Sequence, residues 1–363
     1  MQSAPATSRR VAGKPRVVVT RRLMPATEAR MAELFEAVFN PADIPLDRAA
    51  LVAALQNADV LVPTVTDRID AELIDAAGPQ LGLMANFGAG TEHIDLAAAR
   101  ARRIMVTNTP GVFTDDTADM TMALIVTVTR RFVEGVRLVL TGQWGGWSPS
   151  GLLGHRIAGK RLAILGMGRI GQAVAHRARA FGLEVVYHSR HRIPASLETM
   201  LGARYEPDLD RLIAEADILT LHCPASIATR HILSAARIAA MKPTAYVVNT
   251  ARGELIDEEA LIAALEAGRL GGAALDVFEH EPAVDPRLIA QPNVILIPHL
   301  GSATIEGRED SGARVIANIR YWADGHRPPR SSARRAGLIR HTAPCSISAS
   351  IWRRWLRSPH GDG

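Results

Sequence analysis

The stretch LAILGMGRIGQAVAHRARAFG (162–182) places three glycines between an apolar run and a segment with helical periodicity. In this spacing the first glycine permits a tight turn, the second lets backbone approach a pyrophosphate, and the third allows close helix–strand packing. The free N–H groups at the N-terminus of the following helix attract phosphates. The pattern therefore predicts a dinucleotide-binding turn made by Gly166, Gly168, Arg169, Ile170 and Gly171.

The segment YHSRHR (187–192) lies where such folds read the ribose of the cofactor. Ser189 stands 23 positions beyond Gly166, where a carboxylate would bond the ribose 2′-hydroxyl and repel a 2′-phosphate. A hydroxyl and guanidinium groups bond such a phosphate instead. Ser189, Arg190 and Arg192 thus predict NADP(H) as the preferred cofactor, with NAD(H) possible. The alternative is that both arginines are solvated in a surface loop.

Around this stretch, short apolar runs alternate with helical patterns in two series. Strands are expected at 16–20, 58–65, 81–88 and 104–108, and then at 161–166, 184–189, 216–223, 245–250, 272–278 and 294–299. Helices are expected at 26–39, 46–58, 114–144, 257–268 and 304–323. Such alternation predicts α/β architecture with two doubly wound parallel sheets. The 114–144 helix is more apolar than one domain face needs, which favours domain or subunit packing.

Bulk properties agree with a two-domain soluble protein. The chain of 363 residues exceeds one comfortable core. Its 47% hydrophobic and 22% charged residues are ordinary, and no apolar run reaches the roughly 20 residues of a membrane helix. Cys223 and Cys345 form neither a disulfide framework nor a metal spacing, so we expect a reducing, cytoplasmic location and no metal.

The terminal segments differ from the rest. Residues 1–16 lack the apolar core of a signal peptide and predict a disordered lead, with a transit peptide as the alternative. Residues 330–363 hold seven arginines and one acid, so they carry the net charge of +5 and leave the body near neutral. This argues against nucleic-acid binding. The segment is predicted to be disordered, although IWRRWLR (351–357) is basic and amphipathic.

Three charged residues follow apolar strand-like runs of the second series. Arg252 comes after VVNTA, Glu281 after LDVFEHE, and His299 after VILIP. In parallel sheets ligands bind at the carboxyl ends of the strands, so we expect these residues to meet at a site. Separately, Arg252 could pair with an acid and His299 could be a core histidine.

Five ordered motifs carry a family resemblance: GMGRIGQAVA, LHCPAS, NTARGELIDEEAL, GGAALDVFEHEP and PHLGSAT. With NFGAGTEHIDLAAA (86–99) and VTNTPGVFTDDTADMTMALI (106–125), the chain resembles the D-isomer-specific 2-hydroxyacid dehydrogenases over residues 16–329. WGGWSPSGLLGHRIAGK and YHSRHR are most similar to the glyoxylate/hydroxypyruvate reductase (D-glycerate dehydrogenase) branch. The resemblance implies a Rossmann cofactor domain (106–301) inserted into a flavodoxin-like substrate domain (1–105 and 302–329). Residues 330–363 have no family counterpart.

The resemblance also implies residue roles. Arg252 would bind the carboxylate of a 2-oxo acid, His299 would protonate its carbonyl oxygen, and Glu281 would orient His299 and favour its charged form. Backbone N–H groups of Ala89 and Gly90 would receive the substrate carboxylate. Asp276 would bond the nicotinamide carboxamide, and the cofactor would be lined by Cys223, Pro224, Thr229 and Thr250.

These roles imply an enzyme, a homodimer, that uses NADPH to reduce a small 2-oxo acid, glyoxylate or hydroxypyruvate, to the D-2-hydroxy acid. Two alternatives stay open. One is another family member, such as an NAD-dependent phosphoglycerate dehydrogenase. The other is a nucleotide-sensing corepressor of the same fold, in which the cofactor acts as a conformational ligand.

Overall fold

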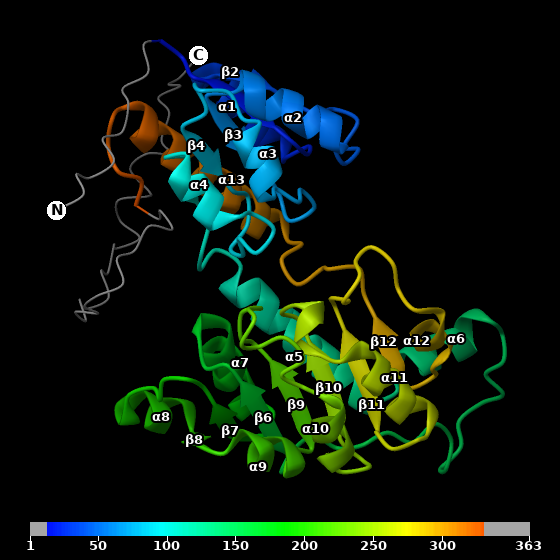
Figure 1. Cartoon of the computed structure of the whole chain (residues 1–363). Helices are drawn as coiled ribbons and strands as arrows, with labels where there is room; N and C mark the ends of the chain where they lie inside the picture. Colours follow the sequence, from blue (N-terminus) through cyan, green and yellow to red (C-terminus); the bar gives the residue numbers. More distant parts are fainter. Residues whose placement is uncertain (1–12, 330–363) are drawn as a thin grey trace, which may run out of the picture. The chain divides into compact units, whose positions relative to one another are not determined.

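The computed structural model describes residues 13–329, which build two parallel sheets, each with helices on both faces (Figure 1). This confirms the predicted α/β class with two doubly wound sheets. The expected disordered lead and Arg-rich tail lie outside the described residues, apart from residues 13–16 of the lead. Within the described chain, no helix is both long and apolar enough to cross a membrane.

The first sheet has five strands in the order β2-β1-β3-β4-β5, all parallel. This is the flavodoxin-like order. The strands are β1 (Arg16–Val19), β2 (Glu36–Val38), β3 (Val60–Val62), β4 (Leu83–Ala85) and β5 (Met105–Thr107). The central strands β3 and β4 are buried along their whole length, as expected for a parallel sheet covered on both faces.

Helices from both ends of the chain cover this sheet. One face packs on α2 (Arg48–Asn57), α3 (Ala71–Asp75) and α4 (Leu96–Ala101). The other face packs on α1 (Pro25–Leu34) and on α13 (Ile305–Ala323). Val315, Ile319 and Trp322 of α13 are buried against β1, β3 and β4. A helix that follows the second sheet in sequence therefore completes the core of the first.

The second sheet has seven parallel strands in the order β12-β11-β10-β9-β6-β7-β8. From β8 to β11 this is the Rossmann order 3-2-1-4-5-6, and β12 adds a seventh strand. The strands are β6 (Arg161–Leu165), β7 (Glu184–His188), β8 (Ala203–Tyr205), β9 (Ile218–Leu221), β10 (Tyr246–Asn249), β11 (Gly272–Leu275) and β12 (Val294–Leu296). Strand order reverses between β6 and β9, the switch point where ligands bind in such sheets.

Alternate residues of these strands feed two separate cores. One core joins the sheet to α5 (Thr114–Thr129), α7 (Arg169–Ala180) and α8 (Ala195–Leu201). The other joins it to α9 (Leu209–Ala214), α10 (Ala235–Ala240), α11 (Glu258–Glu266) and α12 (Pro286–Ala290). The expected capping of α11 is confirmed, because the Asp257 carboxylate accepts a hydrogen bond from Ala260 N.

The single helix expected at 114–144 is wrong. The chain forms α5 and then α6 (Phe132–Leu140), separated by Arg130 and Arg131. Arg131 has φ +53°, a left-handed conformation that a continuous α-helix does not contain. His155 N donates to Thr129 O at 2.7 Å, so a carbonyl at the end of α5 bonds a distant segment instead of the next helical turn.

The helix expected at 26–39 is also too long. It ends at Leu34, and the residues that follow form the edge strand β2, paired with β1 from Arg16↔Glu36 to Val18↔Val38. The strand β8 was not predicted at all. Each of these edge strands has three residues, which is too short for a period-two pattern to be recognised. Pairing with a neighbouring strand decided both.

Candidate active site

The glycine turn after β6 has the geometry that a dinucleotide requires. Gly166 has φ +102°, and a Cβ there would lie 2.7 Å from Cys223 N, so a side chain is excluded on two grounds. A Cβ on Gly171 would strike Gly166 O. Gly168, the N-cap of α7, has no heavy atom within 4 Å of its Cβ position. The turn is thus closed toward the protein and open at Gly168, which fits a pyrophosphate at the helix N-terminus.

The β9 end borders this turn. Thr229 Oγ1 donates to Pro224 O at 2.7 Å and so closes the loop that leaves Cys223. Burial raises the pKa of the Cys223 thiol to about 11, so the group is neutral at physiological pH. An uncharged wall beside the glycine turn adds no repulsion toward a phosphate.

The arginines after β7 are in different states. Arg192 donates from Nε and Nη2 to the two carboxylate oxygens of Glu198, at 2.8 Å each. Arg192, together with the Tyr187 hydroxyl, lowers the pKa of Glu198 to about 2. Ser189 is half-buried directly after β7, and Arg190 is exposed. Of the two arginines, Arg190 is therefore the better placed to reach a ligand without breaking a bidentate pair.

His299 and Glu281 form a hydrogen-bonded pair at the carboxyl edge of the second sheet. His299 Nδ1 lies 2.9 Å from Glu281 Oε2, while Glu281 Oε1 accepts from Phe278 N at 3.1 Å. Burial opposes ionisation of Glu281, but the hydrogen bond and charge of His299 outweigh it and hold the glutamate pKa below its ordinary value. His299 has φ +54°, and a non-glycine residue in that region often marks a functional site.

Arg252 emerges from β10 on the same edge. The Asn249 side chain shapes the turn, since Nδ2 donates to Arg252 O at 2.8 Å and Oδ1 accepts from Ala251 N at 3.0 Å. Arg252 Nη2 lies 3.5 Å from Glu92 Oε2, and the positive charge of Arg252 also contributes to the low pKa of Glu281. Arg252 is thus within electrostatic reach of the His299–Glu281 pair.

The loop after β4 carries Ala89 and Gly90. A Cβ on Gly90 would strike both the Arg252 guanidinium and the Glu92 carboxylate, so only glycine fits there. Asn108 Nδ2 donates to Ala89 O at 2.7 Å. The loop expected to receive the substrate carboxylate therefore lies beside the guanidinium expected to bind it.

Asp276 and Thr250 bond the protein itself. Asp276 is 1% exposed, and its oxygens accept from Leu300 N at 2.5 Å and Gly301 N at 2.8 Å. These amides directly follow His299, whose own N–H donates to Asp276 O at 2.9 Å. Thr250 Oγ1 lies 2.8 Å from Thr121 Oγ1. A contact of Asp276 or Thr250 with a cofactor stays a prediction.

Sequence reasoning missed Glu92 and Asn249. Glu92 was visible as an acid in the substrate-loop motif, but its partner Arg252 lies 160 positions away. Asn249 stands in the NTARGE motif, and its role depends on a local turn that the sequence pattern does not specify.

Comparison with known proteins identifies the family. Residues 122–301 match the family described as D-isomer specific 2-hydroxyacid dehydrogenase, NAD binding domain. The glyoxylate reductase of Thermococcus litoralis is 42% identical over 323 residues, which are 87% of this chain and 96% of that protein.

Solved structures give the same result. A D-isomer specific 2-hydroxyacid dehydrogenase from Polaromonas sp. JS6 66 superposes with a TM-score of 0.83 at 40% identity, over 88% of this chain and all of that one. An NADPH-dependent glyoxylate/hydroxypyruvate reductase from Sinorhizobium meliloti, in complex with NADP and malonate, gives 0.79 at 32%, over 90% and 100%. The chain therefore belongs to the D-isomer specific 2-hydroxyacid dehydrogenase family and is an NAD(P)-dependent oxidoreductase.

Proposed function

We propose that the chain reduces glyoxylate or hydroxypyruvate to the D-2-hydroxy acid, with NADPH as the preferred cofactor. The observation that carries this proposal is the placement of Arg252 between the Gly90 loop and the His299–Glu281 pair. A carboxylate site beside a proton donor is what a small 2-oxo acid requires. Relatives named glyoxylate reductase support the same substrate class.

The substrate carboxylate would bind between Arg252 and the peptide N–H groups of Ala89 and Gly90. A guanidinium forks onto two carboxylate oxygens, which fixes both position and orientation. Because the carbonyl carbon is attached to that carboxylate, its approach to the reacting groups is fixed as well.

His299 would supply the proton to the carbonyl oxygen. Its Nδ1 faces Glu281, so Nε2 is the nitrogen left for the substrate. The low pKa of Glu281 keeps the carboxylate ionised, and a carboxylate next to an imidazole favours the imidazolium that can donate. The nicotinamide, when bound, supplies the hydride.

The cofactor would bind along Gly166, Gly168 and the N-terminus of α7. Ser189 and Arg190 would contact the 2′-phosphate, with Arg192 bracing the loop through Glu198. A 32% identical relative that is NADPH-dependent supports this choice. Use of NAD(H) with comparable efficiency would instead favour the solvated-arginine alternative.

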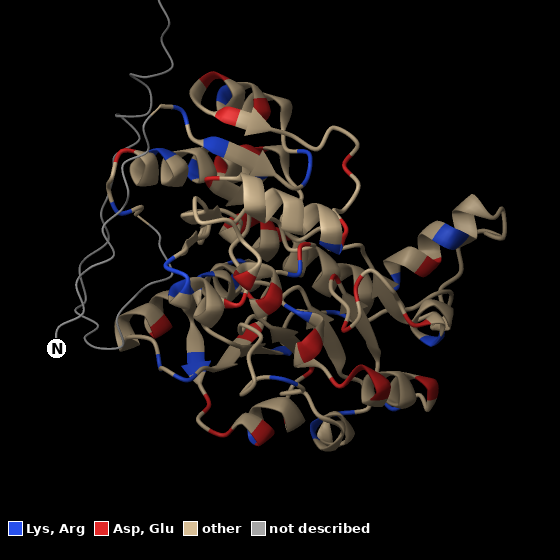
Figure 2. Ribbon diagram, turned by 45° about the horizontal axis from the view of Figure 1, so that its top comes forward, with Lys and Arg blue, Asp and Glu red and all other residues tan. Residues whose placement is uncertain are grey.

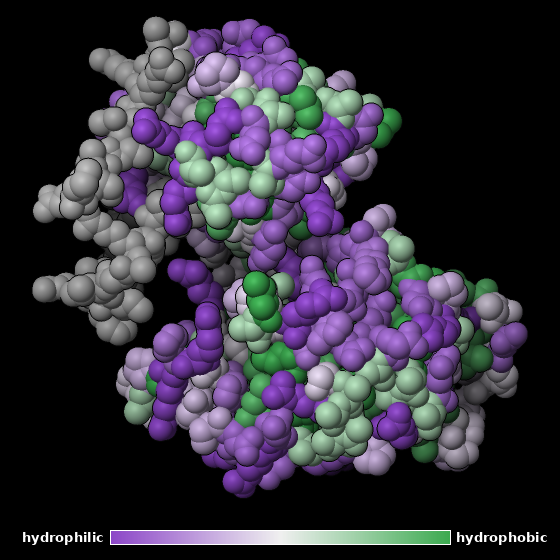
Figure 3. Space-filling view, in the orientation of Figure 1, coloured by the Kyte–Doolittle hydropathy of each residue, from purple (hydrophilic) through white to green (hydrophobic). Residues whose placement is uncertain are grey.

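A homodimer would form through α6 and the segment after it. In α6, Phe132, Val139 and Leu140 have 62%, 62% and 80% of their surface exposed, and no α6 residue is buried. Trp147, in the following segment, is 85% exposed. Large apolar side chains gathered on one exposed helix mark an association surface. In the view of Figure 3, green apolar patches interrupt the hydrophilic surface of the part built on the seven-stranded sheet.

No evidence points to a charged polymer as partner. In the view of Figure 2, basic and acidic residues are interspersed over both sheets and their helices, consistent with the near-neutral charge calculated for the body. The domain boundaries 1–105, 106–301 and 302–329 and a cytoplasmic location remain predictions. The first is supported by the packing of α13 on the five-stranded sheet.

The test is a steady-state panel of glyoxylate, hydroxypyruvate and 3-phosphohydroxypyruvate, each with NADPH and NADH, followed by nicotinamide absorbance. We expect turnover of glyoxylate or hydroxypyruvate, with kcat/KM higher for NADPH. A preference for the phosphorylated substrate with NADH would make the chain a phosphoglycerate dehydrogenase. Cofactor binding without turnover of any 2-oxo acid would favour the corepressor.

A further inference from the structure

The loop at residues 88–90 has all three of its carbonyl groups bound by the protein. Gly88 O accepts from Thr109 N at 2.9 Å and from Asn86 Nδ2 at 3.2 Å. Gly90 O accepts from the same Asn86 Nδ2 at 2.8 Å, and Asn108 Nδ2 binds Ala89 O. One asparagine side chain thus holds two of the three carbonyls.

This arrangement fixes the direction of three peptide N–H groups. In a trans peptide the N–H of one residue points opposite to the carbonyl of the residue before it. Because the three carbonyls face Asn86, Asn108 and Thr109, the N–H groups of the residues that follow them, 89–91, face the other way. Over residues 13–329 these three amides donate to no protein acceptor. They remain available to an anion beside Arg252.

Asn86 is oriented in turn by His93. Both Asn86 hydrogens serve the carbonyls, so its Oδ1 must accept, and Oδ1 lies 3.0 Å from His93 Nε2. That contact requires a proton on Nε2. Asn86 is 1% exposed, so no solvent competes for its amide. The proton on His93 therefore decides which way the Asn86 amide points.

His93 is itself held in a dry, polar surrounding. Its backbone carbonyl accepts from Ile69 N at 2.8 Å, which joins the His93 loop to the loop of Asp67. Among the described residues, His93 Nδ1 and Asp67 Oδ1 are two of the four buried side-chain atoms without a hydrogen-bond partner. Burial lowers the pKa of His93, against the opposing charges of Glu92 and Asp67 and with that of Arg252, so the ring is neutral and carries its single proton on Nε2.

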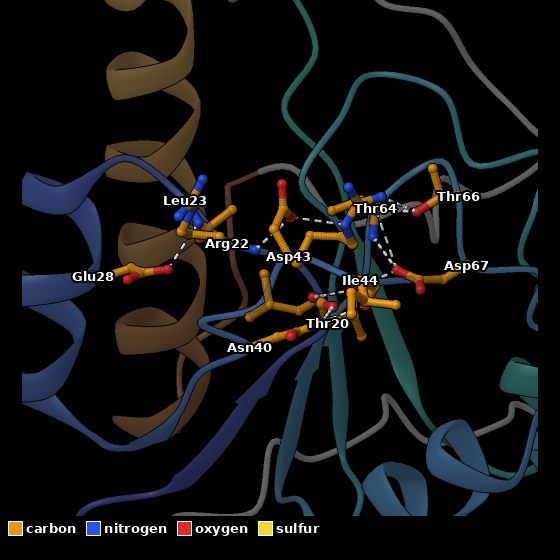
Figure 4. Close-up of polar contacts among 12 residues, drawn as sticks. Thr20, Arg22, Leu23, Glu28, Asn40, Asp43, Ile44, Thr64, Thr66 and Asp67 are labelled. Atoms are coloured by element: carbon orange, nitrogen blue, oxygen red, sulfur yellow. Dashed lines mark hydrogen bonds and ion pairs between the residues drawn. The ribbon is translucent and has the colours of Figure 1, made fainter. Parts of the chain in front are cut away.

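Asp67 has its other oxygen fixed. Thr20 Oγ1 and Thr64 N donate to Asp67 Oδ2 at 2.5 Å and 2.7 Å, at the carboxyl ends of β1 and β3 (Figure 4). The hydrogen bonds within this group thus anchor the Asp67 loop to the central strands. Those strands are the rigid base from which the His93 loop is held.

We propose that His93 is a positioning residue for substrate binding: through Asn86 it aims the peptide N–H groups of residues 89–91 at the carboxylate of the 2-oxo acid. The proposal rests on the proposed function, since it assumes a carboxylate substrate at this loop. It assigns His93 to substrate affinity and leaves the chemical step to His299.

The test compares KM for glyoxylate, KM for NADPH and kcat in four variants. In Asn86→Asp an oxygen replaces the nitrogen that holds Gly88 O and Gly90 O. In His93→Leu the Nε2 donor is lost, whereas His93→Gln keeps an amide donor at a similar distance from the backbone. Asn293→Asp is the matched control, because Asn293 Nδ2 also donates to a backbone carbonyl, Gly271 O at 3.2 Å, but at the opposite edge of the second sheet.

We expect KM for glyoxylate to rise about tenfold in Asn86→Asp and about fivefold in His93→Leu, since one lost hydrogen bond is worth about a factor of five. His93→Gln should restore the parent KM, and KM for NADPH and kcat should change less than about twofold. Melting temperatures identify any variant that fails to fold, and the Asn86→Asp and His93→Gln variants then carry the test.

An unchanged KM for glyoxylate in folded Asn86→Asp and His93→Leu would overturn the proposal, as would a failure of His93→Gln to restore it. Failure of the proposed function would appear differently. The parent and Asn293→Asp would then both lack glyoxylate turnover.

Discussion

Glu281 Oε2 lies 2.9 Å from His299 Nδ1, and its second oxygen is held by the backbone N–H of Phe278. Both oxygens of one carboxylate are therefore engaged, one by the imidazole and one by the rigid end of β11. The histidine ring is fixed in orientation and left with a single free nitrogen. The predictions below follow from this geometry and from the glycine turn.

Replacing Glu281 by Gln should move the pH optimum of reduction to lower pH. The low pKa of Glu281 means that it is ionised throughout the working range, and an ionised neighbour favours the protonated imidazole. Without it, His299 loses its proton at a lower pH, so the protonated donor persists over a narrower range. The measurement is the pH profile of kcat/KM for glyoxylate. A profile that superposes on the parent's would contradict the coupling.

His299→Ala and Arg252→Ala should each lower kcat/KM on the order of 10²–10⁴-fold, because each removes a proton donor or a preorganised charge. Binding of NADPH, followed by fluorescence, should persist in His299→Ala. The exposed residues His176 and Arg269 provide matched controls, and His176→Ala and Arg269→Ala should keep parent activity. Activity near that of the parent in either site variant would remove the role assigned to that residue.

Arg190→Ala should reduce the preference for NADPH over NADH more than Arg192→Ala does. The guanidinium of Arg192 is committed to Glu198, whereas Arg190 is exposed. The ratio of kcat/KM for the two cofactors measures this within each variant. Equal effects of the two substitutions would show that Arg192 leaves Glu198 when the phosphate binds.

Gly168→Ala and Gly171→Ala should separate binding from folding. A methyl group on Gly171 meets Gly166 O, whereas one on Gly168 meets no protein atom. We expect Gly171→Ala to lose about 1–3 kcal/mol of unfolding free energy, the usual cost of overpacking. Gly168→Ala should keep the parent stability but bind NADPH more weakly. Denaturant titration and NADPH titration measure the two effects, and parent-like NADPH affinity in Gly168→Ala would argue against a pyrophosphate there.

Leu140→Glu should convert a homodimer into monomers without unfolding the chain, since Leu140 is 80% exposed and packs on no core. Sedimentation velocity gives the mass, and circular dichroism checks the fold. Exposed Ile227, on the loop after β9, supplies the control Ile227→Glu, which should not change the mass. A parent protein that sediments as a monomer would refute the proposed dimer.

Most of the fold could be read from the sequence because its determinants are local. The glycine spacing at 166–171 specifies a turn that only glycine can form, and long apolar runs such as 161–166 specify buried strands. What failed was also local in cause. Three-residue edge strands and the break at Arg131 carry little pattern, and they are decided by hydrogen bonds to distant segments.

The candidate site divides the same way. The sequence by itself determined which chemical groups are present, a guanidinium, an imidazole and a carboxylate, each at the end of a strand. Only the tertiary structure decided their partners: Glu281 for His299, Glu198 for Arg192, and Glu92 beside Arg252 across 160 positions. Side-chain pairing depends on distances of a few ångströms between strands and loops far apart in sequence, and those distances exist only once the sheets are assembled.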